Sequence, residues 1–210
     1  MDDRKYSEKY WREVYDSANP GNKLHSLITQ TEAIAKDFTA NITPAFDKVF
    51  SQSKRMLEVA CGPGDISNSL QEKYDIDVLG TDFAPTIIKE AQKRFPHGTY
   101  SVLDIFETEQ IVALGKWDII LAANVIEHYR EPYKILETLQ RFCDYVIIIV
   151  PLNEPNISNK HQGESHCTIF DETSFSKYNV VDNFTFTSTG WTKGYQWANL
   201  IGRNIDDNQK

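Results

Sequence analysis

The sequence predicts an α/β fold in which helices cover both faces of a mostly parallel sheet. Apolar segments of strand length alternate with segments of helical spacing through residues 51–150. The run Val-Ile-Ile-Ile-Val at 146–150 is apolar at every position, which is typical of a strand buried on both faces. Residues 180–187 and 194–200 alternate and are rich in aromatic side chains, and we expect them to form a closing antiparallel pair.

The length and composition of the chain are those of one compact domain. With 210 residues, 40% of them hydrophobic, the chain can bury a full core without a second domain. The expected organisation is a single domain, 1–210, with a helical lid or entrance layer at 1–50 and a core at 51–203.

Charge and cysteine usage exclude several classes of protein. A net charge of -8 argues against binding of DNA or long RNA, which favour a basic face. Three scattered cysteines are too few for a disulfide framework, and this indicates a reducing compartment. The N-terminus lacks the apolar core of a secretory signal and no apolar run reaches eighteen residues, so we expect a cytoplasmic protein without membrane insertion.

The first fifty residues show helical spacing. Apolar and aromatic side chains recur there at three to four positions around polar residues. The Asn-Pro-Gly-Asn sequence at 19–22 separates two predicted helices, and Pro44 is expected to interrupt a third. The aromatic members of this layer could close over a ligand or simply pack on the sheet; they are Tyr6, Tyr10, Trp11 and Tyr15.

Five strands of the parallel part are expected next along the chain. Their apolar character and their length distinguish them from the intervening helical segments. The predicted strands are 56–60, 78–81, 100–103, 117–122 and 145–150.

A glycine-bearing turn follows the first predicted strand. The sequence Met-Leu-Glu-Val-Ala-Cys-Gly-Pro-Gly-Asp at 56–65 runs from an apolar strand into a turn and then into a predicted helix at 66–73. Gly62 and Gly64 can take positive φ and let a ligand approach the bare backbone. Asp65 is placed to cap the helix. The turn therefore predicts a ligand-binding site.

An acidic residue ends the second predicted strand. Asp82 lies 18 residues beyond Gly64, about the distance at which an acid holds a pair of ribose hydroxyls. The turn and the acid together predict an adenosine-type ligand. Ser67 stands where a dinucleotide-binding turn has its third glycine, which disfavours a pyrophosphate ligand.

These motifs, over residues 50–200, resemble those of the class I S-adenosylmethionine (SAM)-dependent methyltransferases. Residues 58–65 look like the family's first motif, and residues 117–128 look like its fourth. Asp82 is similar to the acid that holds the ribose, with Phe83 beside the adenine, and Asp104 is placed to contact the adenine amino group. Ala60-Cys61 and Asn124 depart from the usual pattern.

The resemblance implies a Rossmann-like seven-stranded sheet whose last strand is antiparallel, with 51–203 as the cofactor-binding core. It also implies SAM as the cofactor, with S-adenosylhomocysteine (SAH) as the product. The cofactor-binding residues that it implies are Glu58, Ala60, Cys61, Gly62, Gly64, Asp82, Phe83, Asp104, Ile105 and Asn124.

Methyl transfer needs a catalytic base only when the acceptor is a hydroxyl or a protonated amine. His128 follows the fourth predicted strand, and His161, Glu164 and His166 lie in the loop after the fifth. We name His128 and His166 as candidate catalytic residues. The alternative is that Glu127 and His128 brace the next helix and that the loop is a polar surface.

Whether the site holds a metal is left open. Some methyltransferases that modify catechols or RNA 3′ ends carry a Glu-His pair and a later histidine, so Glu127, His128 and His166 are candidate ligands by resemblance. Asn124 stands where the RNA-modifying relatives have a further acid, and many relatives carry the pair without a metal.

The predicted function is transfer of a methyl group to a small-molecule acceptor, of metabolite or sugar and glycan-precursor type. The acidic charge favours this over DNA, and similar short methyltransferases with a loop like that at 150–156 often act on glycan-linked or lipid-linked precursors. An RNA methyltransferase and a non-catalytic protein that keeps the SAM-binding fold are the alternatives. The sequence leaves the acceptor and the oligomeric state open.

Overall fold

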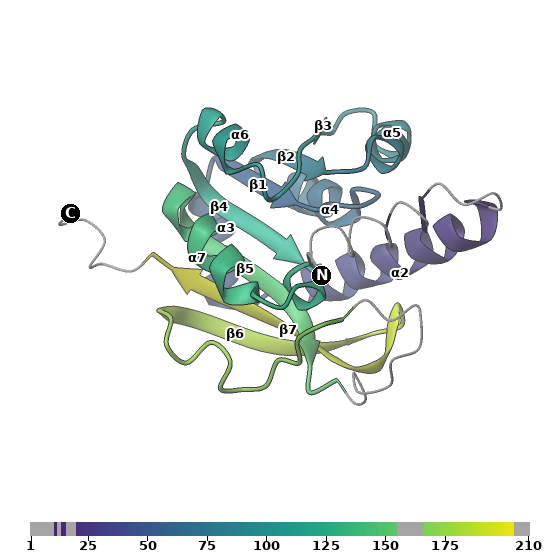
Figure 1. Cartoon of the computed structure of the whole chain (residues 1–210). Helices are drawn as coiled ribbons and strands as arrows, with labels where there is room; N and C mark the ends of the chain where they lie inside the picture. Colours follow the sequence, from purple (N-terminus) through teal and green to yellow (C-terminus); the bar gives the residue numbers. More distant parts are fainter. Residues whose placement is uncertain (1–10, 12–13, 16–19, 155–165, 204–210) are drawn as a thin grey trace.

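The structure, a computed structural model, describes residues 11, 14–15, 20–154 and 166–203. Its centre is a seven-stranded sheet of order β3-β2-β1-β4-β5-β7-β6 (Figure 1). Strands β1 to β5 pair in parallel, whereas β7 runs antiparallel to both of its neighbours. The predicted fold class is confirmed. The strands are β1 (Arg55–Val59), β2 (Asp77–Asp82), β3 (Thr99–Val102), β4 (Trp117–Ala123), β5 (Cys143–Leu152), β6 (Val180–Ser188) and β7 (Trp191–Gly202).

Helices connect most of these strands. No helix among the described residues is long and apolar enough to cross a membrane. The α-helices are α2 (Pro20–Ala40), α3 (Pro44–Gln52), α4 (Asp65–Lys73), α5 (Pro85–Arg94), α6 (Thr108–Ala113) and α7 (Pro132–Leu139), and the short 3₁₀ helices are η1 (Ile126–His128) and η2 (Gln140–Phe142).

Pro44 begins a helix and does not interrupt one, so this expectation is wrong. The side chain of Thr43 accepts a hydrogen bond from the backbone N–H of Phe46, and this caps α3 at its first turn. Proline is well suited to the position after such a cap, because the first helical N–H groups have no partner within the helix. Pro20 likewise begins α2, which is continuous to Ala40.

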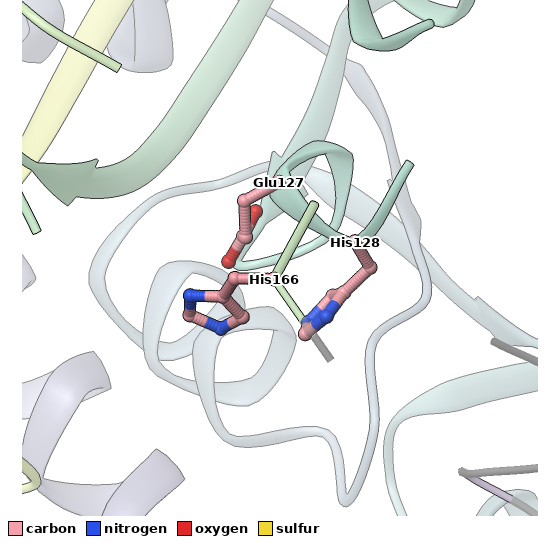
Figure 2. Close-up of side chains that lie close together, drawn as sticks. All are labelled: Glu127, His128 and His166. Atoms are coloured by element: carbon pink, nitrogen blue, oxygen red, sulfur yellow. The ribbon is translucent and has the colours of Figure 1, made fainter. Parts of the chain in front are cut away.

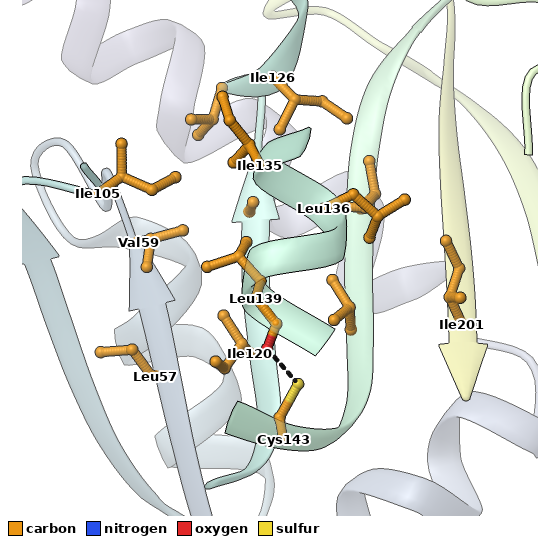
Figure 3. Packing of buried hydrophobic residues seen from close by; sticks show 14 of the residues in the cluster. Leu57, Val59, Ile105, Ile120, Ile126, Ile135, Leu136, Leu139, Cys143 and Ile201 are labelled. Atoms are coloured by element: carbon orange, nitrogen blue, oxygen red, sulfur yellow. Dashed lines mark hydrogen bonds between the residues drawn. The ribbon is translucent and has the colours of Figure 1, made fainter. Parts of the chain in front are cut away.

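The strands bury side chains on both faces of the sheet. On one face, Leu57 and Ile120 pack against Leu136 of α7 (Figure 3). On the opposite face, strand residues pack against the second half of α2, against α3 and against α4. Phe38 and Phe46 are fully buried there. The second half of α2 and α3 therefore belong to the core of the fold.

Three non-glycine residues at one edge of the sheet have positive φ. Ala60, Asn124 and Asn153 directly follow β1, β4 and β5, with φ of 52°, 54° and 50°. Such conformations are uncommon for non-glycine residues and gather at functional sites. This edge also holds the point between β1 and β4 where the strand order reverses, which is the usual place for a ligand in such sheets.

Candidate active site

A cavity of about 280 Å³ lies at this edge of the sheet. Its walls come from the turn after β1, the ends of β2 and β4, the segment after β3, and α2. All the site residues predicted from the sequence line it except Gly64. They are Glu58, Ala60, Cys61, Gly62, Asp82, Phe83, Asp104, Ile105, Asn124, His128 and His166.

The turn after β1 presents bare backbone to the cavity. The N–H of Cys61 donates to the carbonyl of Thr81 at 2.8 Å, which ties the turn to β2. Gly62 has φ of 53°, and a Cβ built on it would meet no atom within 4 Å. Glycine is therefore favoured at this position for its backbone conformation, and the space beside it is open.

Gly64 allows close packing between the turn and β3. A Cβ added at Gly64, where φ is 88°, would lie 2.8 Å from the ring of Tyr100. Tyr100 is itself buried and donates from its hydroxyl to the carbonyl of Gly64 at 3.4 Å. The glycine lets α4 approach β3 closely.

Gly64→Ala is expected to lower the free energy of unfolding by about 2 to 4 kcal/mol, because left-handed strain adds to the overlap with Tyr100. Gly62→Ala is the matched control, since it carries similar strain but meets no neighbour. We expect it to cost about 1 to 2 kcal/mol. Urea unfolding without cofactor measures both, and equal losses would contradict the packing role of Gly64.

Asp65 does not cap α4, and this prediction is wrong. Gly64 occupies the N-cap position, and no side-chain cap is formed. The buried Asp65 carboxylate instead accepts two hydrogen bonds from Arg94, at 2.7 and 2.8 Å, and one from the Thr31 hydroxyl at 2.7 Å. Arg94 also donates to the carbonyl of Pro63 at 2.9 Å. The ion pair therefore holds the turn, α2 and α5 together.

Asp82 is buried at the cavity wall. Its Oδ2 accepts from the N–H of Gly62 at 3.2 Å, and its Oδ1 accepts from the N–H of Ala84 at 3.0 Å. Burial raises the pKa of Asp82 to about 6, so the carboxyl is ionised above that pH. The N–H of Phe83 also bonds to this carboxylate. A carboxylate offers about four lone-pair positions, so it can still accept from a vicinal diol such as that of a ribose.

Glu58 lies at the floor of the cavity, where the Ser67 hydroxyl donates to its Oε2. Burial raises the pKa of Glu58 to about 8, and the bond from Ser67 lowers it in part. Glu58 is therefore mostly protonated at neutral pH and can donate a hydrogen bond as well as accept one.

Polar side chains gather on the part of the cavity beyond β4 and β5. Glu127, His128 and His166 place one donor atom each within 4.8 Å of one another (Figure 2). The His128 ring also meets Trp11 edge-on, with ring centroids 5.4 Å apart. Burial raises the pKa of Glu127 to about 7, and the nearby His166 lowers it in part.

The segment that carries His166 is held against η1. The N–H groups of Cys167 and Thr168 both donate to the carbonyl of Glu127, at 2.6 and 3.1 Å. The His166 Nδ1 forms a hydrogen bond with Glu154, which follows β5. The structure thus brings together the two candidate catalytic histidines.

Several residues of the cavity were missed from the sequence. Gln30 and Thr31 lie on one long helix, and Tyr129 and Glu154 lie in connections. Glu154 lies in the loop at 150–156, which was noted in the sequence without a role for this residue, whereas the other three belong to no motif used in the prediction. Trp11 and Tyr15 of the predicted aromatic layer do line the cavity. The other aromatic and loop candidates lie outside the described residues; they are Tyr6, Tyr10, His161 and Glu164.

Known proteins match this chain in sequence and in fold. Residues 57–144 match a family described as a methyltransferase domain. Malonyl-[acyl-carrier protein] O-methyltransferase from Haemophilus ducreyi is 28% identical over 97 residues. That match covers 43% of this chain and 35% of the relative, so it spans about a third of the relative's length.

Solved structures with the same fold cover more of the chain. Magnesium protoporphyrin IX methyltransferase from Synechocystis PCC 6803 with bound SAH has a TM-score of 0.64 and 15% identity, and the match covers 95% of each chain. Mitomycin 7-O-methyltransferase has a TM-score of 0.60 and 11% identity, covering 93% of this chain and 60% of that one. These TM-scores show a shared fold. Residues 57–144 match a methyltransferase domain, and the chain has the fold of SAM-dependent methyltransferases.

Proposed function

We propose that the chain transfers a methyl group from SAM to a small-molecule acceptor of metabolite or sugar and glycan-precursor type. The observation that carries this proposal is a single cavity with two chemically different parts. Asp82 and the turn at Gly62 line it beside β1 and β2, whereas His128 and His166 line it beyond β4 and β5. The first part offers groups suited to a nucleoside cofactor, and the second offers groups suited to a small second reactant.

The residues of the nucleoside part fit SAM. Asp82 would accept hydrogen bonds from both ribose hydroxyls, and Gly62 leaves room beside the backbone for the methionine part. Phe83 and Ile105 would lie against the adenine, with Asp104 accepting from its amino group. Asn124 has an amide oxygen with no hydrogen-bond partner among the described residues, so it can accept from the cofactor.

Bound SAM would supply a methyl group on a positively charged sulfur. A lone pair of the acceptor forms a bond to the methyl carbon while the carbon–sulfur bond breaks, and the sulfur becomes a neutral thioether. This chain can speed the transfer by holding the acceptor close and in line. Trp11 and Tyr15 cover the cavity beside His128 and would exclude water there. For a hydroxyl or ammonium acceptor, the proton must also be removed.

The size and surroundings of the cavity support a small acceptor. The cavity beneath α2 has a volume of about 280 Å³, near the lower limit for a small-ligand pocket, and this favours a small acceptor. The net charge of -8 disfavours a nucleic-acid acceptor. By their names, the magnesium protoporphyrin and mitomycin methyltransferases that share the fold act on small molecules.

Calorimetric titration with SAM and with SAH, each added to the purified protein, tests the cofactor assignment. We expect both to bind with one site. Isotopic labelling from methyl-labelled SAM into a panel of hydroxylated metabolites and glycan precursors then tests transfer. If neither SAM nor SAH binds, the proposed activity is overturned and a non-catalytic role for the fold is favoured.

His128→Ala is expected to spare SAM binding and to slow methyl transfer by about 10²-fold or more, as when a group acting on the acceptor proton is lost. Steady-state kinetics on the acceptor identified by labelling measure this. His97→Ala is the control, since His97 is exposed and does not line the cavity. Equal rates in both variants would assign His128 a purely structural role.

A further inference from the structure

We infer that Glu127, His128 and His166 bind a divalent transition-metal ion in the wall of the cavity. The inference deepens the proposed function, because the ion would contact a hydroxyl oxygen of the acceptor. Binding of the ion itself depends only on these side chains and their surroundings, and it can be measured without a methyl-transfer reaction.

The three donor atoms converge from two separate segments of the chain. They lie within 4.8 Å of one another, and Figure 2 shows the Glu127 carboxylate beside the His166 ring with the His128 ring on the other side. Metal–ligand bonds of about 2.0 to 2.2 Å need donors about 3 to 4 Å apart, so a small inward movement of the side chains completes the site.

Glu127 gives an independent reason to expect a cation. The residue is 1% exposed, and neither carboxylate oxygen has a hydrogen-bond partner among the described residues. A buried carboxyl without partners is costly, and a coordinated cation removes that cost. A purely structural brace for the next helix would be expected to use these oxygens in hydrogen bonds.

The surroundings of His166 are those of a metal ligand. Its Nδ1 forms a hydrogen bond with the carboxylate of Glu154. Metal-binding histidines usually have such a carboxylate on the second ring nitrogen, because it sets the ring orientation and raises the basicity of the ligand atom. The two backbone bonds to the carbonyl of Glu127 hold this segment in place.

The set of donors selects the class of ion. Two imidazoles and one carboxylate suit Zn²⁺, Mn²⁺, Fe²⁺ or Co²⁺, whereas Mg²⁺ and Ca²⁺ prefer sites built from oxygen alone. Three protein ligands also leave coordination positions open toward the cavity.

An open position can take the acceptor hydroxyl. Coordination lowers the pKa of that hydroxyl, which then loses its proton to water. The oxygen lone pair forms the bond to the methyl carbon, and the carbon–sulfur electron pair returns to sulfur. In this arrangement His128 and His166 act as metal ligands, and no separate base is needed.

The test begins with full-length protein stripped of metal by a chelator and then titrated with Zn²⁺, Mn²⁺ and Co²⁺ in a calorimeter. We expect one equivalent of at least one ion to bind with micromolar or tighter affinity, and Co²⁺ to show the visible absorption of a nitrogen- and oxygen-ligated site. No binding at concentrations of about 100 μM, well above such an affinity, would overturn the proposal.

Variants locate the ion. Glu127→Gln and His166→Ala should each abolish binding, and Glu154→Gln should weaken it by about 10-fold to 100-fold. His97→Ala should leave it unchanged. Circular dichroism confirms folding of each variant, and His166→Ala serves if Glu127→Gln does not fold. Ion affinity that is unchanged in the folded ligand variants would overturn the proposal.

SAM titration of the same metal-free protein separates this inference from the proposed function. SAM binding without metal binding would leave the proposed activity intact and remove the metal site. Metal binding without SAM binding would support the metal site and overturn the proposed activity.

Discussion

Asp82→Ala is expected to weaken SAM binding by about 1 to 3 kcal/mol, or roughly 5-fold to 150-fold, through loss of charge-assisted hydrogen bonds to the ribose. The Asp82 side chain lines the cavity, and its bonds from the Gly62 and Ala84 backbone hold the carboxylate in place to accept from a ribose. Calorimetry at pH 8 measures the loss. Unchanged affinity would contradict the ribose assignment.

Asp82→Asn is the sharper companion variant, because it keeps the size of the side chain, removes the charge and replaces one acceptor oxygen with an NH₂ group. In the free protein, burial raises the pKa of Asp82 from 3.8 to about 6. The folded state therefore holds this proton more tightly than the unfolded chain does. As the pH rises from about 4 to about 6, ionisation of Asp82 lowers the stability of the folded state. A difference of about 2 pKa units corresponds to about 3 kcal/mol.

This gives opposite pH dependences for stability and for binding. As the pH rises from about 4 to above 6, the stability of Asp82→Asn relative to the native protein should rise by about 3 kcal/mol. Below about pH 4 this difference should no longer change with pH, since the native carboxyl is then neutral in both states. SAM affinity of the native protein should fall below pH 6, whereas that of Asp82→Asn should stay level there. Urea unfolding and calorimetry across this range check both. A native-like pH profile in the variant would contradict the argument.

Arg94→Met is expected to lower the free energy of unfolding by about 2 to 4 kcal/mol, because it leaves the buried Asp65 carboxylate without its cation. The Arg94 side chain is 15% exposed and that of Asp65 is 4% exposed, so water replaces the lost bonds only in part. Urea unfolding measures the change. Because Arg94 also holds the carbonyl of Pro63, we expect SAM binding to weaken as well.

Two controls isolate the ion pair. Lys93→Met removes a neighbouring cation whose side chain is 78% exposed, and its pair with Glu90 should be worth at most about 1 kcal/mol. Asp65→Asn combined with Arg94→Met should cost less than the sum of the two single changes, because the buried charge is gone. Additive losses would show that Arg94 stabilises the fold through other contacts.

The core elements could be predicted from the sequence because their signals are local. The continuous apolar run of β5 and the glycines after β1 depend only on neighbouring residues and on the chemistry of turns. Asp82 could also be predicted locally. It ends a strand at a set distance from the turn, and both features lie in one continuous stretch of sequence. The same local reasoning failed at Pro44, since proline both ends and begins helices and only the cap at Thr43 distinguishes the two.

The sequence by itself determined the sheet, the glycine-bearing turn after β1 and the acid that faces this turn, because periodicity and turn chemistry act between residues close in the chain. Only the tertiary structure decided that Asp65 pairs with Arg94, that Gly64 makes room for Tyr100, and that Glu127 lies beside His166. Each of these contacts joins segments far apart in sequence. Their partners are chosen by distance and burial in the folded chain, and no local pattern of residues encodes that choice.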